Sequence, residues 1–324
     1  MAVSLRGEHD ERPLTATECT DAPPQADSKP LVKAVSEKLI VDSRACRDLA
    51  RGFDQLNQRN SGLQHPREAP PGERPRLPVV TYTKTRADAP EGFFAAEAAG
   101  LRWLGVSGGV PVVGVHEVSR TRLVIDRVAT GPASAPAAEE FGRRLARTHD
   151  SGAAWFGVGP DRGPGVGWIG EAPLPLRTEP PASWGAWYAE DRLLHHARRA
   201  HLRDPALTRV VDRLAAGEFD DDAPPARLHG DLWSGNVLWS PSGVVLIDPA
   251  AHGGHRITDL AMLALFGTPH LARIHAAYDE ASTWLPDGWH ELIGLHQLHP
   301  LLVHADLFGG GYGTQAIEVA RRYA

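Results

Sequence analysis

The sequence predicts an α+β protein with two unequal lobes, a small α/β lobe followed by a larger lobe that is mainly helical. Two observations lead to this prediction. Between residues 78 and 128, short β-branched runs alternate with one stretch of helical periodicity. From residue 129 to residue 324, apolar residues recur mostly at helical spacing. Ligands commonly bind in clefts between such units, so we expect the ligand site between the two lobes.

Residues 1–77 differ in composition from the rest of the chain. The segment is charged and rich in proline, and it holds one possible helix at 31–56. Too few apolar groups are present to offset the entropy lost when a chain becomes ordered. We therefore predict an atypical, largely disordered arm that ends where the small lobe begins.

The small lobe is predicted to be a short sheet with one helix packed against it. Three runs have the β-branched, apolar character of strands, and the first of them ends at Lys84. A fourth segment carries apolar groups at helical spacing and includes Glu97. The predicted strands are 77–84, 110–115 and 122–128, and the predicted helix is 93–104.

The large lobe is predicted to be helical on both sides of one strand-containing segment. That segment, 227–248, has two short apolar runs around a polar loop, while 157–181 is rich in glycine and proline and is predicted to be a loop. The predicted helical segments are 136–149, 184–202 and most of 259–324.

Composition excludes several classes of function. The formal net charge is −6 and both signs are interspersed, which argues against a nucleic-acid or anionic-membrane partner held by bulk charge. No apolar run approaches the roughly 18–20 residues of a membrane span. Cys19 and Cys46 are not at a spacing that suggests zinc ligands or a disulfide framework. We expect a cytoplasmic protein of a reducing compartment.

The segment 228–248 contains the candidate catalytic and metal-binding residues. It presents Asp231 and Asn236 in a loop between apolar runs, and Asp248 follows the second run. Phosphoryl transfer needs a carboxylate to orient and deprotonate the attacking hydroxyl, and hard oxygen ligands for Mg²⁺. The same Asp-x-x-x-x-Asn spacing occurs in the catalytic loop of protein kinases. Each residue alone could be a turn former or a cap, but their joint spacing favours a kinase site.

The motif HGDLWSGN at 229–236, with IDPA at 247–250 and GHRITDLAM at 254–262, resembles the fructosamine kinase, or ketosamine kinase, family. That family belongs to a larger protein-kinase-like group that contains aminoglycoside phosphotransferases and choline kinases. The resemblance covers roughly residues 79–324. It implies ATP-dependent phosphorylation of a sugar hydroxyl on a ketosamine, either a small molecule or a glycated protein, which destabilises the adduct and so repairs glycated amines. Further matching segments are 93–104, 167–170, 184–194 and 301–310.

The resemblance also implies roles for individual residues. Asp231 matches the catalytic base, and Asn236 and Asp248 match the Mg²⁺ ligands. Lys84 matches the lysine that contacts the phosphates of ATP, and Glu97 matches its ion-pair partner. Two solvated surface charges are the alternative for Lys84 and Glu97, although a strand-end lysine facing a helix glutamate is well placed for a charge-assisted pair.

Other residues are expected to position the ligands or the loop. The hinge at 125–128, including Asp126 and Val128, should present backbone groups to adenine. Asp259 is expected to brace the catalytic loop by accepting backbone N–H bonds, which is close to the ordinary role of a helix cap. His229 is expected to orient the loop through a backbone bond.

Two candidates for the acceptor site follow from their positions. Trp233 either stacks against the sugar or packs within the protein. Arg192, with His195 and His196, lies on an aromatic helix that is expected to border the acceptor.

One part of the kinase pattern is missing. Kinases of this type place a glycine-containing hairpin over the phosphates before the lysine strand, whereas 61–73 has isolated glycines and several prolines. Two alternative functions therefore stay open. One is an aminoglycoside- or choline-type phosphotransferase, for which the acidic run at 220–222 is a candidate cation site. The other is a kinase-like module that binds nucleotide without turnover.

Overall fold

The computed structural model describes residues 80–160 and 166–324, which belong to a unit that begins at Arg76. The predicted arm at 1–77, its helix at 31–56 and the segment expected to cover the phosphates lie outside the described residues. None of the described helices is long and apolar enough to cross a bilayer.

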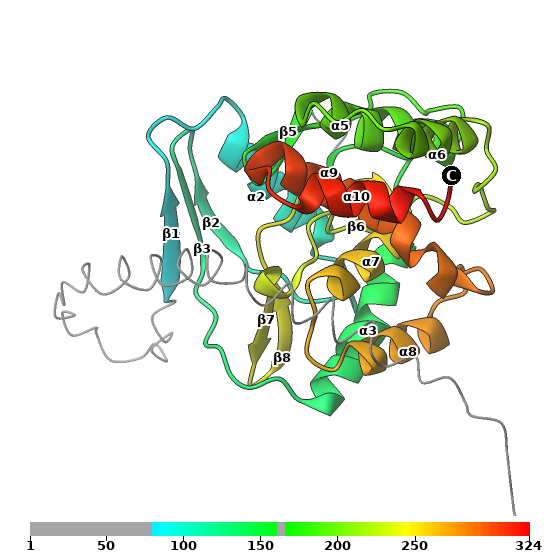
Figure 1. Cartoon of the computed structure of the whole chain (residues 1–324). Helices are drawn as coiled ribbons and strands as arrows, with labels where there is room; N and C mark the ends of the chain where they lie inside the picture. The colour runs from blue at the N-terminus through cyan, green and yellow to red at the C-terminus, as the bar shows by residue number, and fades with distance from the viewer. Residues whose placement is uncertain (1–79, 161–165) are drawn as a thin grey trace, which may run out of the picture. The chain divides into compact units, whose positions relative to one another are not determined.

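The described residues form antiparallel sheets and a set of mostly short helices (Figure 1). The strands are β1 (Thr81–Thr85), β2 (Val115–Val118), β3 (Arg122–Asp126), β4 (Val166–Ile169), β5 (Ala172–Pro175), β6 (Ala226–Leu228), β7 (Val237–Ser240), β8 (Gly243–Leu246) and β9 (His252–Gly254). The helices are α2 (Phe93–Leu104), α3 (Ala135–Asp150), α4 (Trp184–Trp187), α5 (His195–Arg199), α6 (Pro205–Ala215), α7 (Ile257–Leu265), α8 (Leu271–Ala281), α9 (Ile293–Phe308) and α10 (Tyr312–Ala320), with π-helical η2 (Tyr188–Leu194) and 3-10 turns η3 (Ser234–Asn236) and η4 (Trp289–Leu292).

The small lobe is a sheet of order β1-β3-β2 with α2 packed against it. Both strand pairs are antiparallel, and Lys84 of β1 lies opposite Leu123 of β3. Buried side chains of α2, including Phe94 and Leu101, pack with Leu123 and Ile125 to form the core of this lobe. The sheet therefore fixes the direction of the Lys84 side chain relative to α2.

Only the last residue of the predicted strand at 110–115 joins this sheet, where Val115 begins β2 and lies opposite Ile125. Upstream of it, the Leu246 N–H donates to the Pro111 carbonyl at 2.9 Å, and the Val113 N–H donates to the Leu246 carbonyl at 3.2 Å. Val112 thus forms a parallel bridge with the end of β8, in the large lobe. The prediction was therefore wrong for 111–113 and correct for Val115, because β8 lies within reach of 111–113 and satisfies their backbone groups. The chain between α2 and β2 is thus hydrogen-bonded to β8, and these bonds connect the small lobe to the large lobe.

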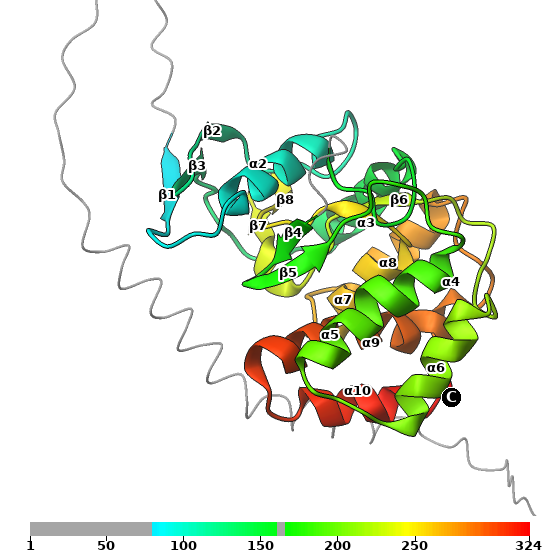
Figure 2. The same cartoon turned by 90° about the horizontal axis from the view of Figure 1, so that it is seen from above.

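The predicted loop at 157–181 contains the β4–β5 hairpin, which turns at Gly170 with a φ of 54°. Pro173 and Pro175 are two positions apart, so their missing N–H groups face the same edge of a two-stranded sheet, where proline is tolerated. The hairpin contacts α2 through β4 and α9 through β5 (Figure 2). It therefore touches both lobes.

The aromatic helix predicted at 184–202 is shorter and less regular than expected. It runs as α4, η2 and α5, with the π-helical segment in the middle, and it ends at Arg199. His201 has a left-handed backbone with a φ of 54°, and the Leu202 N–H donates to the Ala197 carbonyl at 2.9 Å. This is the capping pattern in which a left-handed residue terminates a helix.

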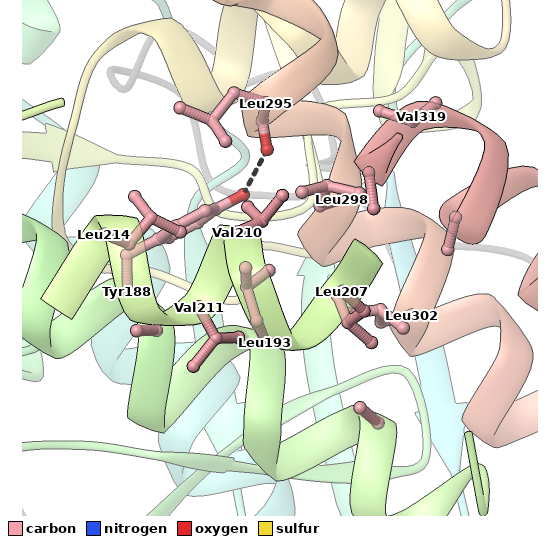
Figure 3. Packing of buried hydrophobic residues seen from close by; sticks show 14 of the residues in the cluster. Tyr188, Leu193, Leu207, Val210, Val211, Leu214, Leu295, Leu298, Leu302 and Val319 are labelled. Atoms are coloured by element: carbon pink, nitrogen blue, oxygen red, sulfur yellow. Dashed lines mark hydrogen bonds between the residues drawn. The ribbon is translucent and has the colours of Figure 1, made fainter. Parts of the chain in front are cut away.

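The large lobe has an apolar core built from the aromatic helix, α6, α9 and α10. Figure 3 shows Tyr188 pointing into this core, where Val210 and Leu298 surround it. The Tyr188 hydroxyl donates to the carbonyl oxygens of Leu295 and His296, at 3.2 and 3.0 Å, so the buried phenol is satisfied. The prediction of an α+β fold with a small lobe and a larger, mainly helical lobe is confirmed.

Candidate active site

The predicted catalytic loop connects β6 to η3 and is shaped by a glycine. Gly230 has a φ of 81°, and a Cβ atom at this position would lie 2.2 Å from the Ala250 carbonyl oxygen. Only glycine fits both the left-handed backbone and this close approach. The loop is thus held against the chain that follows β8, which brings Asp231 toward Asp248.

Asp259, in the first turn of α7, lies beneath the loop. Its carboxylate accepts the N–H of His229 at 2.8 Å and the N–H of Gly230 at 3.0 Å. Burial opposes ionisation, but the hydrogen bond and charge interaction with His149 and the loop N–H bonds hold the pKa of Asp259 below its usual value. An ionised carboxylate is therefore positioned to fix the backbone that leads to Asp231.

His229 connects the loop to the strand region behind it. Its Nε2 lies 2.8 Å from the Ile247 carbonyl, and its Nδ1 lies 3.2 Å from the Asp231 backbone nitrogen. These partners require a neutral ring with the proton on Nε2, since the carbonyl only accepts and the amide only donates. Burial lowers the pKa of His229, in agreement with the neutral form.

Asp231, Asn236 and Asp248 converge at the mouth of the loop. Asn236 Nδ2 donates to the Asp231 carbonyl at 2.8 Å, to Asp231 Oδ2 at 3.1 Å and to the Asp248 carbonyl at 3.4 Å. Desolvation raises the pKa of the half-buried Asp231 to about 7; the Asn236 bond opposes this shift, and the charges of Asp248 and Asp259 add to it. Carboxyl groups with such raised pKa values are typical of general bases.

Lys84 and Glu97 reach the same place from the small lobe. The Lys84 ammonium donates to Glu97 Oε1 at 2.6 Å and also to Asp248 Oδ1. Burial lowers the pKa of Lys84, but the carboxylates of Asp248 and Glu97 outweigh this effect and raise the pKa above its ordinary value. Lys84 is therefore a fixed cation at the junction of the two lobes, next to an aspartate that is 40% exposed.

The donor set fits a Mg²⁺ ion that is shared with phosphates. Within 80–160 and 166–324, no three His, Cys, Asp or Glu side chains are grouped so as to hold a metal by themselves. Among the same residues, Asn236 Oδ1 and Asp248 Oδ2 accept no hydrogen bond and so remain available. Mg²⁺ commonly binds through one or two such protein oxygens and completes its shell with phosphates and water.

The hinge residues lie at the end of β3. The Asp126 carboxylate accepts the Gly114 N–H and contacts His116 Nε2, both at 2.7 Å, and the Arg127 N–H donates to the Val80 carbonyl. In the described part of the chain, the Val128 N–H has no backbone partner, so it is available to a ligand. The Asp126 carboxylate therefore has partners within the small lobe, so only backbone groups of the hinge are available to bind a ligand.

The two acceptor candidates are in different environments. Trp233 is half-buried, covers Gly235 and meets Phe266 edge-on, with ring centroids 6.4 Å apart. Arg192 has no exposed surface; its Nη1 donates to the Pro175 carbonyl, and burial lowers its pKa to about 9. Arg192 therefore offers no exposed guanidinium to an acceptor, whereas Trp233 lies beside the catalytic loop.

Two further residues lie behind the loop and were not predicted from the sequence. His149 at the end of α3 has Nε2 3.2 Å from Asp259 Oδ2 and Nδ1 2.7 Å from the Tyr278 hydroxyl. All three side chains are buried, and burial lowers the pKa of His149. The sequence signal was a histidine at the end of an amphipathic helix, which alone does not reveal a partner on α7 or α8. The pair supports Asp259 from below.

Comparison with known proteins gives a consistent result. The model of the family described as Fructosamine kinase matches residues 80–323. A curated protein of Lactiplantibacillus plantarum, named as a probable ketoamine kinase, is 33% identical over 244 residues, which are 71% of this chain and 82% of that protein. A similarly named protein of Thermus thermophilus is 34% identical over 229 residues, with the same two shares.

Solved structures agree with the sequence relatives. A crystal structure from Thermobifida fusca, described as a candidate fructosamine-3-kinase, is 45% identical and covers 75% of this chain and 85% of its own, with a TM-score of 0.68. A second such structure, from Haemophilus somnus, is 19% identical and covers 75% and 82% of the two chains, with a TM-score of 0.62. The second comparison shows a common fold.

Proposed function

Because the chain belongs to the fructosamine kinase family, a group of phosphotransferases with a protein-kinase-like fold and an alcohol group as acceptor, we propose that it transfers the γ-phosphoryl group of ATP to a sugar hydroxyl of a ketosamine. The acceptor is a fructosamine-type adduct, free or on a glycated protein. Phosphorylation labilises the adduct, so the reaction serves the repair of glycated amines.

In the proposed reaction, Asp231 orients the acceptor hydroxyl and accepts its proton. In the described residues Asp231 Oδ2 is held by Asn236, while Oδ1 has no donor and so can meet a hydroxyl group. The hydroxyl oxygen forms the new bond to phosphorus, the bond from the γ-phosphorus to the bridging oxygen breaks, and ADP leaves. Proton transfer to a positioned carboxylate of this kind typically contributes about 10²–10⁴ in rate.

Three further side chains position the nucleotide. Lys84, held by Glu97 at 2.6 Å, directs its ammonium toward the phosphates. Asn236 and Asp248 would hold Mg²⁺, which when bound neutralises charge on the phosphates. The contact between Lys84 and Asp248 shows that both side chains reach the same point, so phosphate oxygens placed there would meet a cation and a metal ligand together.

One observation supports this proposal most directly. Side chains from three separate parts of the sequence meet at one place: Lys84 and Glu97 from the small lobe, Asp231 and Asn236 from the catalytic loop, and Asp248 after β8. If these residues only formed turns or capped helices, their side chains would not need to meet at one place. The half-buried carboxylate, the fixed cation and the free oxygen ligands together match the needs of phosphoryl transfer.

An ATP-consumption assay tests the proposal. The full chain is incubated with ATP, Mg²⁺ and a simple fructosamine, with an aminoglycoside and choline in parallel, and phosphorylated acceptor is identified by mass spectrometry. We expect phosphate on the fructosamine alone and loss of product with Asp231→Asn. Preferential phosphorylation of the aminoglycoside or choline, or no phosphorylated acceptor at all, would overturn the proposal.

A further inference from the structure

Four rings form a continuous row that begins in the catalytic loop. Trp233 meets Phe266 at a centroid distance of 6.4 Å, Phe266 meets His304 at 4.8 Å, and His304 meets Phe308 at 5.5 Å. Phe308 is 63% exposed and the other three are half-buried. We call these four residues the aromatic row. The row thus runs from the catalytic loop to a ring that is mostly exposed to solvent.

The row is fixed relative to the catalytic base. Trp233 lies two residues after Asp231, and its N–H donates to the Asp231 carbonyl at 3.1 Å. Phe266 directly follows α7, the helix whose Asp259 holds the loop. His304 and Phe308 are on α9, which packs against α7 (Figure 1). The first ring of the row thus belongs to the same loop as Asp231, and the last two rings lie on the helix that packs against α7.

The surface of the row is neutral. His304 is its only titratable member; its Nδ1 donates to the Pro300 carbonyl at 2.7 Å, and burial lowers its pKa, so the ring carries no charge at neutral pH. The side chain of Asp306, a neighbour on α9, is 5% exposed, and its carboxylate contacts His196 at 3.0 Å and Arg199 at 2.6 Å. The row thus offers ring faces, which suit flat or apolar groups.

We propose that the aromatic row binds the part of the acceptor that hangs on the ketosamine nitrogen and selects acceptors in which this part is aromatic or apolar. The inference rests on the proposed function, because the sugar hydroxyl of a ketosamine must lie at Asp231. Fructosamine-type adducts share one sugar, so the nitrogen-borne group is the portion in which they differ. Its stacking on Phe308 and Phe266 would set specificity while Asp231 and Asn236 serve every acceptor alike.

The test compares two adducts of the same sugar, the fructose adducts of benzylamine and of methylamine. We expect kcat/KM to be about 5- to 10-fold higher for the benzylamine adduct, the size expected for one or two ring contacts. Phe308→Ala should reduce this ratio to about 2 or less, whereas Phe308→Tyr, which keeps a ring, should retain it. Since Phe308 is mostly exposed, the fold should survive either change, and melting curves check this.

Trp284 supplies the matched control. It is also exposed, at 45%, but it lies between α8 and η4 and outside the row. Trp284→Ala should leave the ratio unchanged. Two results would refute the role of the aromatic row without contradicting the proposed function. In the first, both adducts are turned over and the wild-type ratio of their kcat/KM values is near 1. In the second, Phe308→Ala does not change this ratio. No turnover of either adduct would overturn the proposed function and the row with it.

Discussion

Replacing Asp259 by alanine should destabilise the fold and slow the reaction together. The side chain is 1% exposed and serves three donors, the N–H groups of His229 and Gly230 and the Nε2–H of His149. Leaving one buried donor unpaired costs about 1–3 kcal/mol, so three could cost about 3–9 kcal/mol. Because water and local relaxation recover part of this, we expect a loss of about 3–5 kcal/mol, as when one member of a buried pair is removed.

The assay for this variant is urea unfolding at pH 7, combined with steady-state kinetics under conditions where the variant is folded. A loop that loses its brace misplaces Asp231, and misplacement by about 1 Å can reduce kcat by up to ~100-fold. Asp259→Asn, which keeps one acceptor oxygen, should fall between wild type and Asp259→Ala. Asp212, exposed on α6, is the control, and Asp212→Ala should stay within about 0.5 kcal/mol. A loss below about 1 kcal/mol for Asp259→Ala would refute the reasoning.

Three further predictions concern the same site. Asp231→Asn should lower kcat by about 10²–10⁴ while nucleotide affinity, measured by calorimetry, stays largely intact; more than about a tenth of wild-type kcat would contradict its role as base. Asp248→Ala should lower the affinity for Mg²⁺-nucleotide more than Asn236→Ala, because a carboxylate supplies charge and an amide only a dipole; in a Mg²⁺ titration at fixed ATP, midpoints of both variants equal to that of wild type would remove both residues from the metal site. Gly230→Ala should lower the free energy of unfolding by about 1–3 kcal/mol from its positive φ alone, and by more because of the clash; Gly288→Ala, with a similar φ of 73° and open space around the Cβ position, should lower it less, and equal losses would exclude the clash.

The loop that we propose to be catalytic could be recognised in the sequence because its signal is local. Asp231 and Asn236 are five residues apart in one motif, and Asp248 follows the next apolar run. The fold class was also predictable, since the sequence changes from β-branched runs to helical spacing near residue 129, and this change can be seen without knowing how the elements pack. In both cases, the spacing of residues along the chain was sufficient for the prediction.

Contacts between distant segments could not be predicted in the same way. The strand character of 110–115 was recognised, but its partner on β8 depends on how the lobes meet. Arg192 has the sequence context of a surface residue on a helix, yet the π-helical segment and the β4–β5 hairpin bury it. The bond from His149 to Asp259 joins residues 110 positions apart, and no local pattern indicates such a pair.

The backbone of Asp248 has a consequence for engineering. Its φ is 56°, a left-handed conformation in which an aspartate is strained and a glycine is not. A search for thermostable variants that scored only melting temperature would therefore favour glycine at this position. The stabilised protein would keep its fold and lose the carboxylate that faces Lys84. The strain at Asp248 is thus a place where stability and activity oppose each other, and a screen must measure both to preserve the enzyme.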